Sequence, residues 1–156
     1  MFRKAALLLS AIATIACATS SKSDLFNNRD CNFYGASFCI ESIGDGIYVE
    51  NGPDFLVYNF GVEEKNVLAI YEGDYPQVFG PEEFLPKRIG GVAVKYREFD
   101  DGETVHRYFY NEGLGRPKAL HMMSPKEMND RQRQFVDNAL ASLHYCRPSG
   151  ASMICN

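Results

Sequence analysis

The chain has no excess of basic residues and no apolar run long enough to cross a membrane as a helix. Its 156 residues include 16 Lys and Arg against 20 Asp and Glu, which gives a formal net charge of −4. Nucleic-acid binding depends on clustered positive charge, and anionic lipid also attracts basic surfaces. The main uncharged apolar run covers only residues 5–16, whereas a membrane-spanning helix needs about 20 residues. These absences argue against nucleic acid as a partner and against a transmembrane helix.

The chain also lacks the sequence motifs of common metal, cofactor and catalytic sites. His106, His121 and His144 do not occur in an H-E-x-x-H spacing, and the cysteines form no C-x-x-C pair. Gly113-Leu114-Gly115 lacks the third glycine of a phosphate loop, and residues 35–39 lack the second glycine of a nucleophile elbow. We therefore predict no metal, no cofactor and no enzymatic activity. A small hydrolase that uses His106 or His121 as a base stays open as an alternative, because their strands could be neighbours.

The amino-terminal residues predict export. A short basic start, Arg3-Lys4, precedes the uncharged apolar segment at residues 5–16. This order is typical of a signal peptide, and the positive charges favour keeping that end in the cytoplasm during translocation. We expect residues 1–16 to be the signal peptide, residues 17–30 to form a flexible polar tether, and residues 31–156 to fold as one domain.

The end of the signal resembles a bacterial lipobox. Residues Thr14-Ile15-Ala16-Cys17 place a small residue before the cysteine, with Thr14 at a position where the lipobox pattern prefers Leu. The resemblance implies that Cys17 is lipidated and becomes the mature amino terminus. Because Ala18 rather than Asp follows, it also implies tethering to the outer membrane on the periplasmic side. A plain secretory cleavage within Ala16-Cys17-Ala18 is the alternative and gives a soluble secreted form.

Four of the five cysteines stay available for pairing once Cys17 is lipidated or removed. An even number of cysteines in an exported chain predicts two disulfide bonds. The spacing favours two local loops, Cys31–Cys39 and Cys146–Cys155, each fixing one end of the domain. The crossed arrangement, Cys31–Cys155 with Cys39–Cys146, is the alternative.

From residue 46 onward the pattern predicts β-strands. Segments rich in aromatic and β-branched residues either alternate with polar residues or form short apolar runs, and turn signals such as Asn51-Gly52 and Asp101-Gly102 separate them. We expect strands at residues 47–50, 54–60, 67–72, 92–97, 104–110 and 119–123. Residues 76–88 contain three prolines and predict a long surface loop.

One amphipathic helix is expected after the strands. Ser124-Pro125-Lys126-Glu127 has the pattern of a capping box, with Ser124 as N-cap, Pro125 at the first helical position and Glu127 at the third. Apolar residues then recur at helical spacing on one stripe: Met128, Phe135, Val136, Ala139, Leu140 and Leu143. Strands followed by one helix predict an α+β fold. In it, an antiparallel sheet of about five to six strands carries one C-terminal helix, and disulfides fix both ends.

The acidic residues and the tyrosines suggest where a partner would bind. Pairs of acids lie in predicted turns and loops, where they are solvated and can steer the domain toward a basic partner. Partly exposed tyrosine suits a protein interface, because it offers a large contact area at a low ordering cost. We predict a protein partner of basic character, with the following candidate contacts: Tyr75, Phe79, Glu82, Glu83, Asp100, Asp101, Tyr108 and Tyr110.

Two segments resemble those of small exported α+β proteins of Gram-negative bacteria. They are Leu68-Ala69-Ile70-Tyr71-Glu72-Gly73-Asp74-Tyr75-Pro76 and the closing helix Asp137-Asn138-Ala139-Leu140-Ala141-Ser142-Leu143. Some proteins of this kind are periplasmic immunity proteins against toxins delivered by neighbouring cells. The resemblance implies an envelope binding protein that acts as an inhibitor or immunity protein on a secreted enzyme or toxin. A structural or assembly lipoprotein of the envelope and the small hydrolase are the alternatives.

Overall fold

The computed structural model describes residues 31–80, 83–111, 119–149 and 152–155. The predicted signal peptide, Cys17 and the tether lie outside the described residues. The described residues form eleven strands and one helix. These are β1 (Phe33–Tyr34), β2 (Phe38–Ile40), β3 (Gly46–Asn51), β4 (Phe55–Val62), β5 (Lys65–Gly73), β6 (Leu85–Ile89), β7 (Val92–Asp100), β8 (Thr104–Tyr110), β9 (Ala119–Pro125), α1 (Asp130–Ala141), β10 (His144–Ser149) and β11 (Ser152–Cys155).

The predicted fold class is wrong. The described residues are mostly β, and their strands form a seven-stranded and a four-stranded sheet instead of one sheet of about five to six strands. Strand β6 (Leu85–Ile89) overlaps the end of the expected loop at residues 76–88. Its residues 85–88 are all exposed, so no apolar alternation marks it. Strands β1, β2, β10 and β11 are short, and β2 pairs with β10 about a hundred positions away, a contact that no local pattern reveals.

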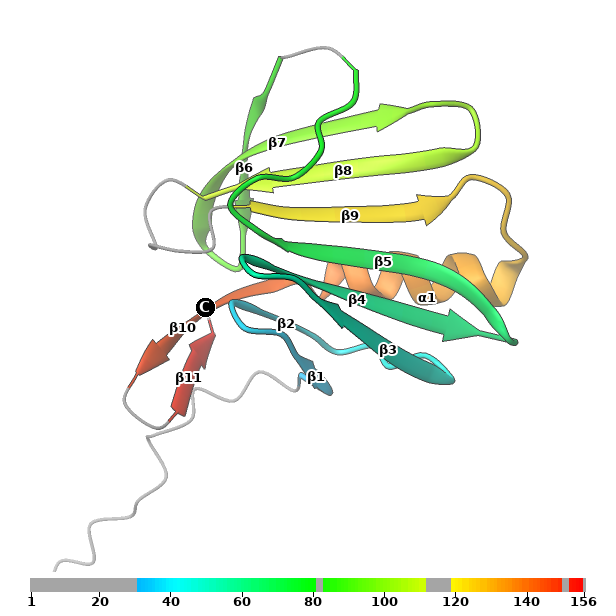
Figure 1. Cartoon of the computed structure of the whole chain (residues 1–156), viewed down its shortest axis with the longest axis horizontal. Helices are drawn as coiled ribbons and strands as arrows, with labels where there is room; N and C mark the ends of the chain where they lie inside the picture. The colour runs from blue at the N-terminus through cyan, green and yellow to red at the C-terminus, as the bar shows by residue number, and fades with distance from the viewer. Residues whose placement is uncertain (1–30, 81–82, 112–118, 150–151, 156) are drawn as a thin grey trace, which may run out of the picture.

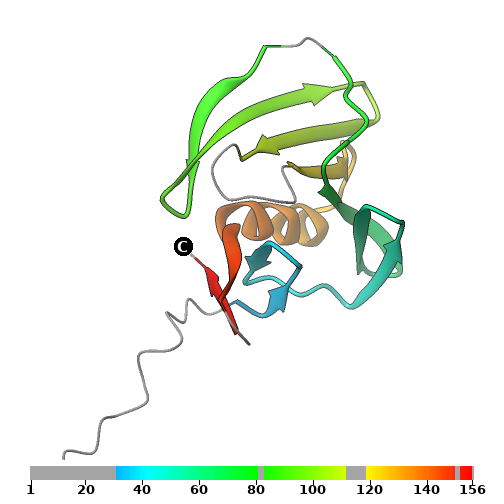
Figure 2. The same ribbon diagram turned by 60° about the vertical axis from the view of Figure 1, so that its left-hand side comes forward.

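The seven-stranded sheet runs in the order β3-β4-β5-β9-β8-β7-β6, and every neighbouring pair is antiparallel. The sheet bends around α1, and β1 and β2 lie on the other side of the helix (Figure 2). Alternate residues of a strand face opposite sides of a sheet. One side of the large sheet therefore faces α1, and its outer side faces away from the helix.

The core lies between α1 and the inner face of the large sheet. Phe60 on β4 and Phe135 on α1 have ring centroids 6.0 Å apart, and Val136 and Ala139 of the helix are fully buried. Each fully buried aromatic or aliphatic side chain contributes about 1.5–3 kcal/mol. Phe38 and Tyr145 from the four-stranded sheet join the same core, so the two sheets and the helix form one packed unit.

The helix starts later than the sequence predicts. Ser124 and Pro125 belong to β9, where they pair with Val105 and Thr104. Asn129 is the N-cap instead: its side chain accepts a hydrogen bond from the amide of Gln132, and the Gln132 side chain accepts one from the amide of Asn129. The long-range pairing of β9 with β8 holds Ser124 and Pro125 in a strand, so the capping box forms at Asn129 instead.

The outer face of the large sheet is crossed by residues 74–80, which follow β5. In Figure 1 this segment passes in front of β9 and β8, on the side away from α1. The Tyr108 hydroxyl binds two of its backbone groups: it donates to the carbonyl of Gln77 (3.1 Å) and accepts from the amide of Phe79 (3.0 Å). The segment is therefore attached to the sheet through its backbone.

The four-stranded sheet, in the order β1-β2-β10-β11, carries both disulfides. Cys31 is bonded to Cys39 and Cys146 to Cys155, which is the local pairing that the sequence favours. Two disulfides are consistent with an exported protein. Within the described part of the chain, no helix has the length and apolarity needed to cross a membrane.

Candidate functional site

Among the strands that the structure describes, β3 at one end of the seven-stranded sheet is the one whose residues are all exposed. It pairs with β4 on one side only, and no described strand pairs with its other edge. All six of its residues are exposed. Ile47, Tyr48 and Val49 are 38%, 66% and 46% exposed. An exposed, apolar edge of this kind is a ready template for pairing with another chain.

The two faces of β3 differ in chemistry. Ile47 and Val49 lie opposite Phe60 and Tyr58 of β4, so they continue the apolar inner face of the sheet to its edge. Tyr48 lies opposite Asn59 and therefore faces the outer side. On that side Glu50 accepts a hydrogen bond from the Asn59 side-chain amide at 3.0 Å.

A shallow hollow of about 590 Å³ lies beside this edge. Its lining comes from β3, β4, β5 and the residues that join them: Asp45, Gly46, Ile47, Tyr48, Glu50, Asn59, Gly61, Glu64, Lys65 and Asn66. Three carboxylates and one ammonium group line it. Asp45 is also paired with Arg131 of α1 at 3.0 Å. The other charged groups of the lining are the two carboxylates of Glu50 and Glu64 and the single ammonium group of Lys65. The hollow therefore carries negative charge.

The opposite edge of the same sheet is protected. Strand β6 contains Pro86, Lys87 and Arg88, and proline and charged side chains are the usual means by which proteins prevent edge pairing. In β3 the one charged residue is Glu50. Of the two edges of this sheet, β6 therefore carries protecting residues and β3 is open to pairing.

The predicted partner-binding residues gather elsewhere, around segment 74–80 and the β7–β8 turn. Tyr75 is 77% exposed, and Asp100 and Asp101 are exposed in the turn. Glu83 is exposed and Tyr110 half-buried, whereas Glu82 lies outside the described residues. Phe79 is half-buried, with its ring centroid 4.8 Å from that of His106. Tyr108 is fully buried, so its place is beneath the segment and it cannot contact a partner.

Beneath this segment, three side chains form a hydrogen-bonded row on the outer face. Nδ1 of His106 lies 3.0 Å from Nε2 of His121, and Nε2 of His106 lies 3.1 Å from Oδ2 of Asp101. The carboxylate can only accept, so Nε2 of His106 carries a proton, and when His106 is neutral its Nδ1 carries none. In that state His106 accepts through Nδ1, and His121 donates through Nε2–H. The Tyr108 ring stacks on His121 at 4.1 Å.

The row keeps His121 uncharged. Burial, followed by the nearby charges of His106 and Arg97, lowers the pKa of His121 to about 3. Backbone amides of Thr104 and Glu103, followed by His106, lower the pKa of Asp101 to about 2. His106 and His121 are 5% and 3% exposed. Two rings that share one hydrogen bond can pass a proton between them, but both are buried and the Phe79 ring packs against His106.

The third histidine lies in a different region. His144 lines a groove of about 640 Å³ between α1 and strands β6 to β8. Three charged groups of that groove contact residues of its own walls. Glu98 accepts from the Tyr96 hydroxyl at 2.6 Å and from Nε of Arg107 at 3.0 Å, and Nζ of Lys87 lies 3.9 Å from the centre of the Tyr96 ring.

A buried carboxylate joins the amino-terminal strands to the large sheet. Glu72 on β5 is 3% exposed and accepts hydrogen bonds from the Tyr58 hydroxyl and the amide of Ala36, both at 2.9 Å. Burial and the Glu72 charge raise the pKa of the Tyr58 hydroxyl. The arrangement fixes residue 36 against β5, which is a structural role.

Metal-ligating groups come together at one place among the described residues, namely Cys39, Cys146 and Cys155. Their sulfur atoms are in disulfide bonds, and disulfide sulfur is not the thiolate that binds a metal ion. Comparisons with protein-family models, with curated proteins and with solved structures found no match.

The sequence predicts a strand at residues 47–50 but does not mark it as a surface for binding. Its signal is the run Ile47-Tyr48-Val49, three apolar residues in a row without a flanking Lys or Pro. In a strand with one buried face, the middle residue would face solvent. Only the order of the strands shows that β3 lies at the edge of the sheet, where its residues are exposed on both faces.

Proposed function

We propose that the protein is an exported protein-binding domain that captures an extended segment of a partner at the open edge of β3. The observation that supports this most is the exposure of Ile47, Tyr48 and Val49 on an edge strand. Strand addition supplies main-chain hydrogen bonds along the whole strand, and the alternating side chains supply the specificity.

The two faces of β3 define the partner's side-chain pattern. An added strand extends the inner face over Ile47 and Val49, so alternate partner residues should be apolar. On the outer face it meets Tyr48 and Glu50 beside the acidic hollow, so the intervening residues should be basic. An alternating apolar and basic segment fits both faces.

The charges favour a foreign segment over a second copy of this chain. Two β3 strands would bring together two acidic hollows, and the charged side chain on each strand is Glu50. Like charges brought close together at an interface weaken the binding free energy by roughly several kcal/mol. A basic segment instead finds complementary charge. This agrees with the basic partner that the sequence predicts.

The place of action and the type of partner belong to the same proposal. The predicted signal peptide and the resemblance to a lipobox support a periplasmic location, with a lipid on Cys17 that anchors the protein to the outer membrane. If the partner is a secreted enzyme or toxin, capture of an extended segment at β3 would make the protein an inhibitor or immunity protein. We propose binding rather than catalysis because both histidines of the row are buried, and Phe79 of segment 74–80 packs against His106.

A defined peptide tests the proposal without knowledge of the natural partner. A fluorescently labelled peptide of alternating Lys and Val should bind, and one of alternating Glu and Val should not, as measured by fluorescence anisotropy. Val49→Lys, which places a protecting charge on the edge, should abolish binding. Leu85→Lys adds the same charge at the β6 edge, where Leu85 is 60% exposed, and should leave binding intact.

Two results would overturn the proposal. One is binding of the Lys–Val peptide that Val49→Lys and Leu85→Lys weaken equally, since general charge attraction then explains it. The other is absence of binding to either peptide while circular dichroism shows the chain folded.

A further inference from the structure

The four cysteines of the described residues form one sulfur cluster. Cys39 is fully buried on β2, and Cys146 and Cys155 lie opposite each other on β10 and β11. The Sγ atoms of these three residues all lie within 4.8 Å of one another. Each disulfide therefore has a sulfur atom of the other disulfide close to it.

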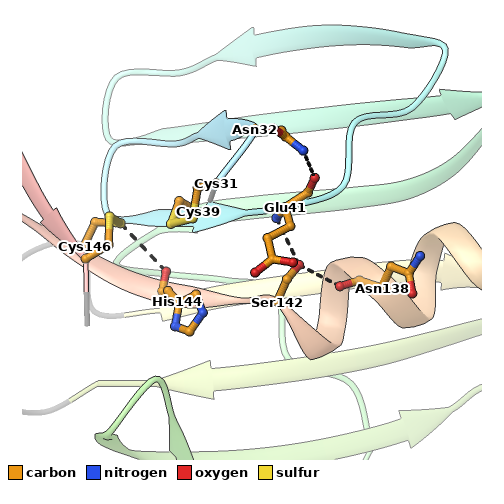
Figure 3. The surroundings of a disulfide bond; sticks show 9 residues. Cys31, Asn32, Cys39, Glu41, Asn138, Ser142, His144 and Cys146 are labelled. Carbon is orange, nitrogen blue, oxygen red and sulfur yellow. Dashed lines mark hydrogen bonds between the residues drawn. A yellow bond between two sulfur atoms is a disulfide. The ribbon is translucent and has the colours of Figure 1, made fainter. Parts of the chain in front are cut away.

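Strand pairing explains the proximity. Strands β2 and β10 are hydrogen-bonded neighbours in which Cys39 lies opposite His144, and the amide of Cys146 donates to the carbonyl of Ser37 at 2.7 Å. Cys39 and Cys146 are thus diagonal neighbours on the same face of the sheet (Figure 3). Such neighbours have Cα atoms about 7–8 Å apart, and disulfides span up to about 6.8 Å. A small strand movement would bring the two residues into bonding distance.

We propose that these residues form a thiol–disulfide exchange centre, in which the local pairs convert to the crossed pairs Cys39–Cys146 and Cys31–Cys155. The conversion joins the amino-terminal strands covalently to the C-terminal hairpin. It is independent of strand addition at β3.

The reaction needs a thiol as catalyst and no net oxidation. An external thiolate attacks Sγ of Cys31, forms a mixed disulfide there and releases Cys39 as a thiolate. Cys39 attacks Sγ of Cys146, and the Cys146–Cys155 bond breaks to release the Cys155 thiolate. Cys155 then attacks Sγ of Cys31, forms Cys31–Cys155 and returns the external thiolate. Two disulfides are present at the start and at the end.

Exposure decides where the external thiol enters. Cys31 is half-buried, whereas Cys39, Cys146 and Cys155 are 0%, 3% and 6% exposed. Attack at Cys31 releases the deepest sulfur, which lies against the second disulfide and away from solvent. The released Cys39 thiolate is therefore placed to react within the protein.

Tryptic peptide mapping separates the two pairings directly. Trypsin leaves Cys31 and Cys39 together in residues 30–65, and Cys146 and Cys155 together in residues 134–156, because Pro148 follows Arg147. After native incubation of the mature chain with a small amount of reduced glutathione and acid quenching, the crossed pairing gives one disulfide-linked species of both peptides. The local pairing gives two separate peptides.

Two single-cysteine variants test the order of attack with equal numbers of thiols. Cys31→Ser leaves Cys39 free, and we expect linked peptides to form without added thiol. Cys39→Ser leaves Cys31 free, and we expect linked peptides in much lower yield. Circular dichroism should show both variants folded.

The proposal is overturned if the folded wild-type chain gives only separate peptides after incubation with glutathione. It is also overturned if the two variants link their peptides at equal rates, because the buried position of Cys39 then confers no advantage. If either variant fails to fold, the tryptic peptide map of the wild-type chain alone decides whether the crossed disulfides form.

Discussion

Acidification should destabilise the folded protein through His121. In the folded state burial, followed by the charges of His106 and Arg97, lowers the pKa of His121 to about 3, while in the unfolded chain the pKa of histidine is about 6.5. The unfolded state therefore binds a proton at a higher pH than the native state. The free energy of unfolding should be unaffected above about pH 6.5, fall as the pH drops below that value, and stop falling near pH 3.

The magnitude follows from the two pKa values. Between about pH 7 and pH 5, His121 titrates in the unfolded state and stays neutral in the native state, so its linkage lowers the free energy of unfolding by about 2 kcal/mol. Asp101 makes no difference in this range, because its pKa of about 2 and that of an unfolded Asp, about 3.9, both lie below it.

Urea unfolding at both pH values measures the effect. The chain has nine tyrosines and no tryptophan, so tyrosine fluorescence or circular dichroism can follow the transition. His121→Gln keeps an N–H donor for His106 and cannot titrate, so its loss of stability between the two pH values should be about 2 kcal/mol smaller than that of the wild type. Asn129→Ala, which removes the N-cap of α1 and leaves the His106–His121 row intact, serves as a control and should keep the wild-type pH dependence. Equal pH dependence in wild type and His121→Gln would refute the reasoning.

Three further predictions concern particular contacts. Asn129→Ala should lower the free energy of unfolding by about 1 kcal/mol, because it removes the N-cap of α1; an unchanged urea midpoint would contradict this cap. Tyr108→Phe should lower it by about 1–3 kcal/mol and speed hydrogen exchange at the amide of Phe79, to which the hydroxyl is bonded, and exchange at the wild-type rate would argue against the attachment. Phe135→Ala should cost about 3–5 kcal/mol, since the ring packs against Phe60 in the core; a loss below 1 kcal/mol, roughly the value for a surface substitution, would contradict that packing.

Local patterns predict most strands of the large sheet and fail for β6 and for the four-stranded sheet. Strands β5 and β8 are recognisable because their apolar residues face a core, as with Ile70 and Phe109, which are 0% and 1% exposed. Strand β6 is exposed along residues 85–88 and carries proline, so nothing in its sequence distinguishes it from a loop. The four-stranded sheet depends on contacts between the two ends of the chain, which are distant in sequence.

The candidate site shows the same division. A strand at residues 47–50 is predictable, but its position at an unprotected edge depends on the order of seven strands. The sequence places Asp101 in a turn and His106 in a strand, and leaves open whether His106 meets His121. The structure answers this because β8 and β9 are paired, with His106 opposite Met123 and Tyr108 opposite His121. The sequence predicts Tyr108 as a partner contact because exposed tyrosine suits interfaces. In the structure its hydroxyl binds the protein's own backbone instead.

Hydrogen exchange of the backbone amides at residues 46–51 tests strand addition at β3 most directly. Strand pairing engages main-chain groups on the open edge of β3, so saturating Lys–Val peptide should slow exchange in this segment and leave residues 85–89 of β6 unchanged. The Val49→Lys chain should show no slowing. Unchanged exchange at residues 46–51 in the presence of bound peptide would contradict strand addition at β3.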